Sequence, residues 1–313
     1  MISENQLSSQ ISPLFRRQIP LLQARPGRRP AAAIFLSGSG SNAERILEAC
    51  REAGEKAPFR PVAIVTDAPE TSRAGELAAN YRLPLVENDI RKFYRSRGET
   101  RVSLSTEGGR RARAEWTARL REQLAAFEVD FGILAGFVPL TNITDDFPCL
   151  NVHPGDLTYE KGGRRWLVGL HTVPVERAIL EGLDSLRSSV ILAQSYTAGG
   201  DNMDSGPILG LSEPVPIDLR GHSLEQLEEC LRQRPKCRPK GGFGDILEEL
   251  AREHLQRLKV EGDWRVFPPA VFDFARGRYA LDQDGGLLFR LGGRRHPVAT
   301  VVYGEQGREV IFR

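Results

Sequence analysis

The sequence predicts an α/β protein with a mostly parallel central sheet and a small β-rich C-terminal appendage. The sheet is predicted by short apolar runs, such as Ala31–Leu36 and Pro61–Val65, that alternate with segments of helical periodicity. The first run ends in a serine- and glycine-rich turn, Ser37–Asn42, which is typical of a strand-to-helix connection in such sheets. The appendage is predicted by short apolar runs around glycine turns, for example at residues 284–286, in the part that follows Trp264.

The elements of the N-terminal half follow from local patterns. Ile46, Leu47 and Cys50 fall on one stripe of a helix that begins after the glycine-rich turn, and Trp116 and Leu120 lie on the apolar face of another. Residues 88–111 are charged and weakly periodic, which predicts a surface insertion. In chain order we therefore expect strands at 31–36, 61–67, 83–86 and 131–138, and helices after 42, at 72–81 and at 113–127.

The C-terminal half is divided by loops. A polar, glycine-bearing loop at 158–168 precedes a helix at 175–183, a strand at 188–196, an acidic loop at 199–207 and a strand at 208–211. Helices are expected at 223–231 and 243–258. We assign residues 1–30 to an N-terminal arm and linker, 31–217 to the main domain, 218–262 to a helical connection and 263–313 to the β-rich extension.

Composition excludes several classes of function. The 313 residues include 43 basic and 41 acidic side chains, so a net charge of +2 gives no reason to expect nucleic acid or membrane partners. The basic clusters at 110–113 and 232–240 are expected to be solvated surface. The four cysteines form no CxxC pair, so no metal site is expected. With neither a signal peptide nor a long apolar run, we expect a cytoplasmic protein.

The segment Leu150–Gly155 carries the first candidate catalytic groups. Asn151 and His153 are two residues apart, so on an extended segment both side chains point to the same face. An asparagine amide can hold a carbonyl oxygen while a neighbouring histidine moves a proton. The alternative is a structural turn with a hydrogen-bonded histidine, and spacing alone leaves both open.

Two glycine-rich segments suggest ligand sites. Ser37–Asn42 lies between a strand and a helix, where free backbone N–H groups at the helix N-terminus can bind a phosphate. It is neither a Walker A loop nor the full dinucleotide fingerprint, and a plain tight turn is the alternative. Gly199–Pro207 is rich in acid and glycine, but it lacks the spaced oxygen ligands and closing Glu of an EF-hand calcium loop.

Taken in order, these segments resemble the folate-dependent formyltransferases, most closely the branch that acts on glycinamide ribonucleotide. The resemblance covers roughly residues 31–217. The matching segments are Ser-Gly-Ser-Gly-Ser-Asn at 37–42, Leu-Ala-Gly-Phe at 134–137, Leu-Asn-Val-His-Pro at 150–154, Gly-Leu-His-Thr at 169–172 and Met-Asp-Ser-Gly-Pro-Ile at 203–208. Each is weak alone, whereas the ordered set is specific. It implies a Rossmann-like fold and transfer of a formyl group from 10-formyltetrahydrofolate to a primary amine.

The resemblance implies a catalytic trio of Asn151, His153 and Asp204. Asn151 would donate to the developing oxyanion, His153 would stabilise it and deliver a proton, and Asp204 would hold the imidazolium. Asp201 is the competitor for the acidic role, and the Asp-Ser-Gly-Pro match favours Asp204. The reaction requires no metal and no covalent intermediate.

The resemblance also implies two binding segments. The substrate phosphate would be held by Gly38, Ser39, Gly40, Ser41 and Asn42. Folate would lie against Leu134, Phe137, Val138, Pro139, Leu140, Gly200 and Asp201. The partners implied are small molecules, and a homodimer is left open.

Departures from the family pattern put the acceptor in doubt. After His153-Pro154 the family commonly has Ser-Leu-Leu-Pro, whereas this chain has Gly155-Asp156-Leu157-Thr158 and a longer loop to Gly169. The default acceptor is glycinamide ribonucleotide, in a step of purine biosynthesis. The alternatives are another amine such as an amino-sugar nucleotide, hydrolysis of 10-formyltetrahydrofolate, and a folate-binding module without turnover. The part from Trp264 is expected to support assembly or to close the acceptor site.

Overall fold

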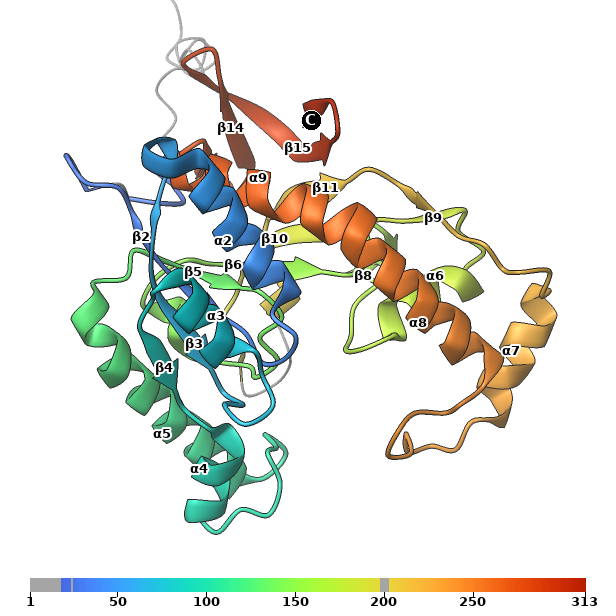
Figure 1. Cartoon of the computed structure of the whole chain (residues 1–313). Coiled ribbons are helices and arrows are strands. Elements are labelled where there is room, and N and C mark those ends of the chain that lie inside the picture. Colours follow the sequence, from blue (N-terminus) through green and yellow to red (C-terminus); the bar gives the residue numbers. More distant parts are fainter. Residues whose placement is uncertain (1–17, 24, 198–202) are drawn as a thin grey trace, which may run out of the picture.

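A single twisted sheet runs through the computed structural model, which describes residues 18–23, 25–197 and 203–313. Its strand order is β1-β13-β14-β15-β11-β10-β6-β5-β2-β3-β4, and β16 pairs with β15. Helices cover the sheet, and a lobe that carries α6, α7 and α8 projects from one side (Figure 1). The predicted α/β class, the mostly parallel central strands and the additional C-terminal strands are all confirmed.

The parallel half of the sheet comes from the N-terminal part of the chain. Its strands are β2 (Ala31–Phe35), β3 (Arg60–Thr66), β4 (Leu85–Glu87), β5 (Phe131–Leu134) and β6 (Cys149–His153). All five residues of β2 are buried, because helices cover both of its faces. Ala32 and Ile34 pack into one hydrophobic cluster, and Ala33 and Phe35 pack into the other, as the two-residue period of a strand requires.

Two sets of helices cover these faces. The first consists of α2 (Ser41–Ala53), the 3-10 turn η3 (Gly54–Lys56) and α3 (Ala74–Tyr81). The second consists of α4 (Ile90–Ser96), α5 (Glu107–Leu124) and the turn η4 (Ala125–Phe127). The prediction of an irregular surface insertion at 88–111 is therefore wrong in part. Ile90, Phe93 and Tyr94 form a short buried stripe, and the Asp89 side chain caps α4 by accepting from the Lys92 backbone N–H.

The antiparallel half of the sheet is built mostly by the C-terminal part of the chain. Its strands are β10 (Ser189–Ala193), β11 (Ile208–Ser212), β13 (Tyr279–Leu281), β14 (Leu287–Leu291), β15 (Arg294–Gly304), β16 (Gly307–Phe312) and, from the N-terminal arm, β1 (Ile19–Pro20). β15 lies parallel to β11, with Leu211 opposite Val302. The strands predicted as an appendage thus continue the central sheet.

The C-terminal extension begins with a helix, α9 (Trp264–Ala275), before its strands. Val266, Phe267, Ala270, Val271 and Phe274 of α9 are buried in the same cluster as residues of α2 and the sheet. α9 follows α8 (Ile246–Leu258) through a π-helical turn, η7 (Lys259–Asp263). The extension therefore supplies part of the main hydrophobic core, although the predicted domain limits stay predictions.

The projecting lobe has its own hydrophobic cluster. The elements of the lobe are β7 (Glu160–Lys161), β8 (Arg164–Arg165), α6 (Val173–Leu180), β9 (Ser185–Leu186), β12 (Val215–Pro216), α7 (Leu224–Gln233) and α8. Short 3-10 turns, η5 (Asn142–Asp145) and η6 (Met203–Ser205), lie in loops of the main body. In the described ranges, no helix is both long and apolar enough to span a membrane.

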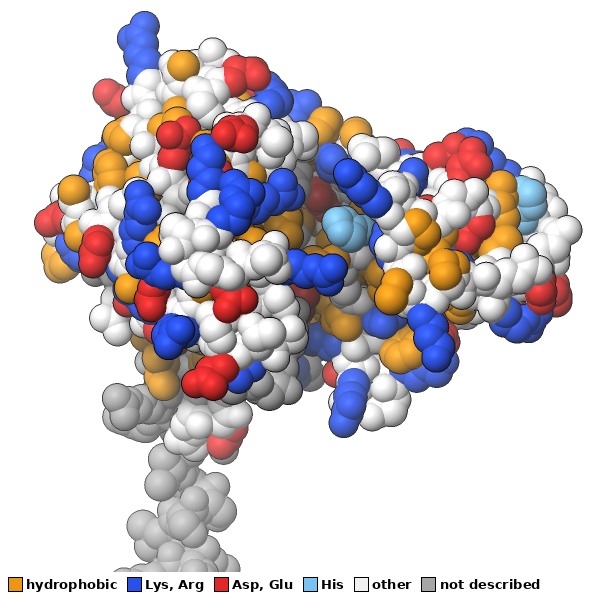
Figure 2. Space-filling view, turned by 90° about the horizontal axis from the view of Figure 1, so that it is seen from below, with side chains coloured by type: hydrophobic (Ala, Val, Ile, Leu, Met, Phe, Trp, Pro, Cys, Tyr) orange, Lys and Arg blue, Asp and Glu red, His pale blue; other side chains and the backbone are white. Residues whose placement is uncertain are grey.

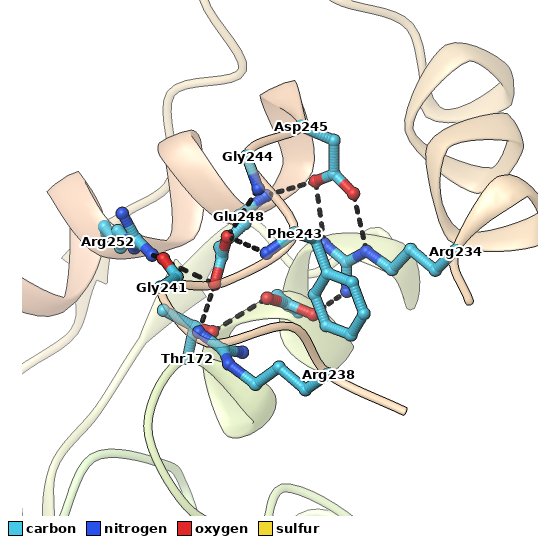
Figure 3. Close-up of polar contacts among 10 residues, drawn as sticks. Thr172, Arg234, Arg238, Gly241, Phe243, Gly244, Asp245, Glu248 and Arg252 are labelled. Carbon is cyan, nitrogen blue, oxygen red and sulfur yellow. Dashed lines mark hydrogen bonds and ion pairs between the residues drawn. The ribbon is translucent and has the colours of Figure 1, made fainter. Parts of the chain in front are cut away.

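A buried ionic network fastens the segment between α7 and α8 to α6. The Arg234 side chain is 7% exposed and donates to both Asp245 oxygens, at 2.6 and 2.8 Å, and to Glu176 at 2.5 Å. Glu176 also accepts from the Thr172 hydroxyl at 2.8 Å, at the beginning of α6 (Figure 3). The Arg234 hydrogen bonds hold the pKa of Asp245 below its usual range.

Two basic clusters that we expected to be solvated are therefore partly buried. Arg234 belongs to the 232–240 cluster, and Arg113 of the 110–113 cluster is 4% exposed. Arg113 donates to the Tyr94 hydroxyl at 3.1 Å and to the Leu140 carbonyl at 2.5 Å. Each guanidinium is accommodated inside the protein because acceptors from distant segments surround it.

We expect Phe274→Ala to lower the free energy of unfolding by about 3–5 kcal/mol, since it removes a fully buried ring from the main core. The matched control is Phe312→Ala, because Phe312 is 58% exposed and its loss should cost within about 0.5 kcal/mol. Urea unfolding followed by circular dichroism measures both. Equal losses for the two variants would show that α9 does not belong to the core.

We expect Arg234→Ala to cost about 3–5 kcal/mol of stability, because Glu176 and Asp245 would keep their charges without the cation that they surround. Arg232→Ala, in the last turn of α7 two residues before Arg234, is the control, since the Arg232 side chain is 63% exposed and pairs with Glu229 in solvent. Thermal unfolding of both variants tests this difference. A fall of the same size for the two arginines would contradict it.

Candidate functional site

Asn151, His153 and Asp204 meet at one point in the middle of the sheet. Asn151 and His153 lie on β6, and Asp204 lies in η6, 53 and 51 positions further along the chain. The Asn151 Nδ2 atom is 3.4 Å from Asp204 Oδ1, and the His153 Nδ1 atom is 3.6 Å from Asp204 Oδ2. The amide and the imidazole therefore share a face, as the strand period predicts, and one carboxylate spans both.

The other nitrogen of His153 has a separate partner. Nε2 lies 2.7 Å from the Leu167 carbonyl oxygen, which can only accept, so Nε2 carries a proton. Nδ1, the other ring nitrogen, faces the Asp204 carboxylate. His153 is 4% exposed, so bulk water has little access to it.

The local sequence makes this approach possible. His153 is held in the sheet opposite Ser189 of β10, and the Ser189 hydroxyl donates to the Gly155 carbonyl at 2.7 Å. A Cβ atom at Gly155 would lie 2.5 Å from the Leu167 carbonyl oxygen and 3.3 Å from the His153 ring. Only glycine lets residue 167 come close enough to bind Nε2.

The predicted phosphate loop lies at the N-terminus of α2. Gly40 precedes the helix with φ of 66°, and a Cβ atom there would come within 2.8 Å of Leu36 and Leu77 side chains. The first N–H groups of a helix have no partner within the helix, so they remain available to an anion. Ser37 has a structural role, since its hydroxyl donates to Asp67 at 2.5 Å and accepts from the Val138 N–H at 2.9 Å.

Arg73 supports the loop from the neighbouring segment, and sequence reasoning missed it. Its backbone N–H donates to the Gly38 carbonyl at 3.0 Å, and its guanidinium donates to the Ser39 carbonyl at 3.2 Å. The same guanidinium pairs with Glu44 and Glu76, so its charge is largely balanced within the protein. The isolated arginine in the sequence gave no signal of this role.

Asp263 connects the phosphate loop to the strand beside His153, and it was also missed. Its carboxylate accepts from Asn42 Nδ2 at 2.9 Å and from the Ser188 hydroxyl at 2.6 Å, and Ser188 precedes the residue opposite His153. The amide oxygen of Asn42, Oδ1, is buried without a hydrogen-bond partner in the described ranges. Burial raises the pKa of Asp263, and hydrogen bonds from Ser188 and Asn42 oppose that rise. Asp263 fell at the predicted boundary between the helical connection and the β-rich extension, where no local pattern marked a site residue.

The predicted folate segment divides into a buried and an exposed part. Leu134 is fully buried at the end of β5, and Phe137 stacks on Trp116 with ring centroids 6.3 Å apart. Val138 is 56% exposed and, with Pro139 and Leu140, lines a cavity of about 450 Å³. That volume falls within the usual range for small-molecule sites. Gly200 and Asp201 lie outside the described residues, so their predicted contacts are untested.

Two further hollows are lined by none of the trio. One of about 600 Å³ is lined by Thr144–Pro148, Leu192–Ser195 and Ser205, next to Asp204. A larger hollow of about 860 Å³ is formed by the C-terminal strands, and none of the trio lines it. Figure 2 shows a recess between the main body and the projecting lobe, with Lys and Arg side chains around it. In the described part of the chain, no three His, Cys, Asp or Glu side chains are grouped to hold a metal ion.

We expect Asp263→Asn to gain stability relative to the natural protein as the pH rises. Because burial raises the folded-state pKa of Asp263 above its ordinary value, its neutral form is favoured on folding and the ionised form carries a cost at higher pH. The amide stays neutral, so the stability difference should widen from pH 4 to pH 8, as followed by urea unfolding. Asp184→Asn, at an exposed position, should show no such widening. A difference that stays constant with pH would refute the assignment.

Comparison with known proteins gives a consistent result. No protein-family model matches the chain. A curated relative, the chloroplastic phosphoribosylglycinamide formyltransferase of Arabidopsis thaliana, is 30% identical over 158 residues, which are 49% of this chain and 46% of the relative. The match thus spans about half the length of that relative.

Solved structures extend the likeness over most of the chain. Glycinamide ribonucleotide transformylase 1 from Symbiobacterium toebii is 23% identical with a TM-score of 0.53, covering 88% of this chain and 98% of its own. The phosphoribosylglycinamide formyltransferase from Anaplasma phagocytophilum is 17% identical with a TM-score of 0.56, covering 89% and 100%. The Coxiella burnetii protein of the same name is 16% identical with a TM-score of 0.55, covering 88% and 100%. The resemblance to the folate-dependent formyltransferases is thereby confirmed, and the chain has the fold of the glycinamide ribonucleotide formyltransferases.

Proposed function

We propose that this chain transfers a formyl group from 10-formyltetrahydrofolate to the primary amine of a small phosphorylated acceptor, with glycinamide ribonucleotide as the default acceptor. The observation that carries the proposal is the convergence of Asn151, His153 and Asp204 at the strand end beside the phosphate loop. The names of the similar proteins support formyl transfer and the same acceptor class.

The site residues have distinct roles in this reaction. When bound, the folate supplies the formyl carbon, which forms a bond to the acceptor nitrogen and loses its bond to the folate nitrogen. The Asn151 amide donates to the formyl oxygen as negative charge develops there. His153 carries a proton on Nδ1 toward the reacting atoms, and Asp204 balances that charge. The proton lost by the acceptor amine is returned to the folate nitrogen, so the transfer is balanced without metal or oxidant.

The binding groups fit the two substrates. The backbone N–H groups of residues 39–42 would hold the phosphate. The Asn42 side-chain NH2 group would not take part, because it already donates to Asp263. The cavity beside Val138–Leu140 has the volume for a folate ring system, and Asp67 and Arg113 lie on its wall. The acceptor amine would then lie between the phosphate loop and Asp204.

We expect His153→Ala and Asp204→Asn each to lower the rate of formyl transfer by at least about 100-fold, because each removes a group that moves or balances the proton. The measurement is tetrahydrofolate release from 10-formyltetrahydrofolate with and without glycinamide ribonucleotide. His222→Ala is the control, since His222 lies beside α7 and outside the site.

The outcomes separate the alternatives. Release that needs the ribonucleotide supports the proposed transfer and acceptor. Release without any acceptor indicates hydrolysis, and folate binding without release indicates a binding module. Near-normal turnover in either site variant would refute the assigned trio.

A further inference from the structure

The longer loop after His153 contains a β-hairpin that reaches the catalytic trio. β7 and β8 pair with each other, and Glu160 lies opposite Arg165. Gly162 and Gly163 form the turn between them, with φ of 61° and 72°. Two successive residues with positive φ make a tight hairpin turn, which glycine adopts without strain. The hairpin is thus a defined element placed between His153 and α6.

The base of this hairpin is fixed to α6. Glu181, at the end of that helix, accepts from Lys161 Nζ at 2.7 Å and from the Tyr159 hydroxyl at 3.2 Å. Arg177 donates to the carbonyl oxygens of Trp166 and Val168, at 2.8 and 2.9 Å. Since α6 is itself tied to the buried Arg234 network through Glu176, the hairpin rests on a rigid support.

The Arg165 side chain extends from this support to the loop that carries Asp204. Its guanidinium donates to the Asp204 carbonyl oxygen through Nη1 and to the Gly206 carbonyl oxygen, 2.7 Å away, through Nη2. A Cβ atom at Gly206 would come 1.9 Å from the Leu192 carbonyl oxygen, so this part of the loop lies tightly against β10. The planar fork of an arginine presents two N–H donors in a fixed geometry that holds two carbonyl groups at once, whereas the donors of a lysine rotate freely.

The same short segment also orients His153. Leu167, two residues after Arg165, accepts from His153 Nε2. One anchored stretch of chain therefore fixes the imidazole on one side and the main chain of Asp204 on the other. The contact between His153 Nδ1 and Asp204 Oδ2 depends on both of these attachments.

We propose that Arg165 is a positioning residue for the proposed formyl transfer, acting through the main chain of Asp204, and that the hairpin is the element that delivers it. This inference rests on the proposed function. Burial lowers the pKa of the Arg165 guanidinium, and the neighbouring Asp204 carboxylate opposes that fall, so the cation is held where it faces the acid of the trio. Misplacing a reacting group by about 1 Å is enough to cost roughly 100-fold in rate.

The test compares three variants of the full-length chain. Arg165→Ala should lower kcat for formyl transfer by about 10- to 100-fold while the KM values for both substrates stay within about twofold, because the geometry of Asp204 changes and the binding segments do not. Arg165→Lys should recover part of kcat, since an ammonium can reach one carbonyl. Arg164→Ala, on the exposed neighbour in β8, should match the natural protein.

Hydrogen exchange measured by mass spectrometry provides a second readout that needs no activity. Amides of residues 203–206 should exchange faster in Arg165→Ala than in Arg164→Ala. If the natural protein shows no transfer, the proposed function fails, and the exchange data still decide whether Arg165 holds the loop. Unchanged kcat and unchanged exchange in Arg165→Ala overturn the inference, as does a loss of activity that appears only as higher KM. If Arg165→Ala does not fold, Arg165→Lys and Arg165→Gln are compared by the same criteria.

Discussion

The buried carboxylate of Asp263 constrains the arrangement of the whole site. A carboxylate in the protein interior is costly unless hydrogen bonds satisfy it, and this one accepts from Asn42 on α2 and from Ser188 before β10. The two donors belong to distant parts of the chain. The absence of a side chain at Gly262 lets Ser188 approach, since a Cβ atom there would lie 2.6 Å from the Ser188 hydroxyl. These bonds hold the predicted phosphate loop against the strand that borders His153.

The sequence predicted the parallel half of the sheet because its strands are buried on both faces and read as continuous apolar runs. It predicted the C-terminal strands but not their attachment, because β15 joins β11 through few residues and no local pattern marks a distant pairing. α9 was missed for a related reason. Its two consecutive prolines, Pro268 and Pro269, suggest a break in helical structure, whereas α9 includes both of them.

For the site, strand periodicity alone placed Asn151 and His153 on one face, and the structure agrees. Asp204 could be assigned only through the family resemblance, because no spacing links it to β6. Arg113 and Arg234 were misjudged, since whether an arginine is buried depends on acceptors such as Glu176 that are far away in sequence. Asp263 and Arg165 escaped notice for the same reason: their partners are set by tertiary structure.

The exposure of the trio indicates a route for the proton in the proposed reaction. The His153 side chain is 5% exposed, and its Nε2 is occupied by the Leu167 carbonyl, so the ring has no direct exchange with solvent. The Asp204 side chain is 26% exposed and faces Nδ1. Asp204 is therefore the member of the pair that water can reach. Because the imidazole and the carboxylate face each other, the proposed reaction depends on the loop that holds Asp204 as well as on the strand that holds His153.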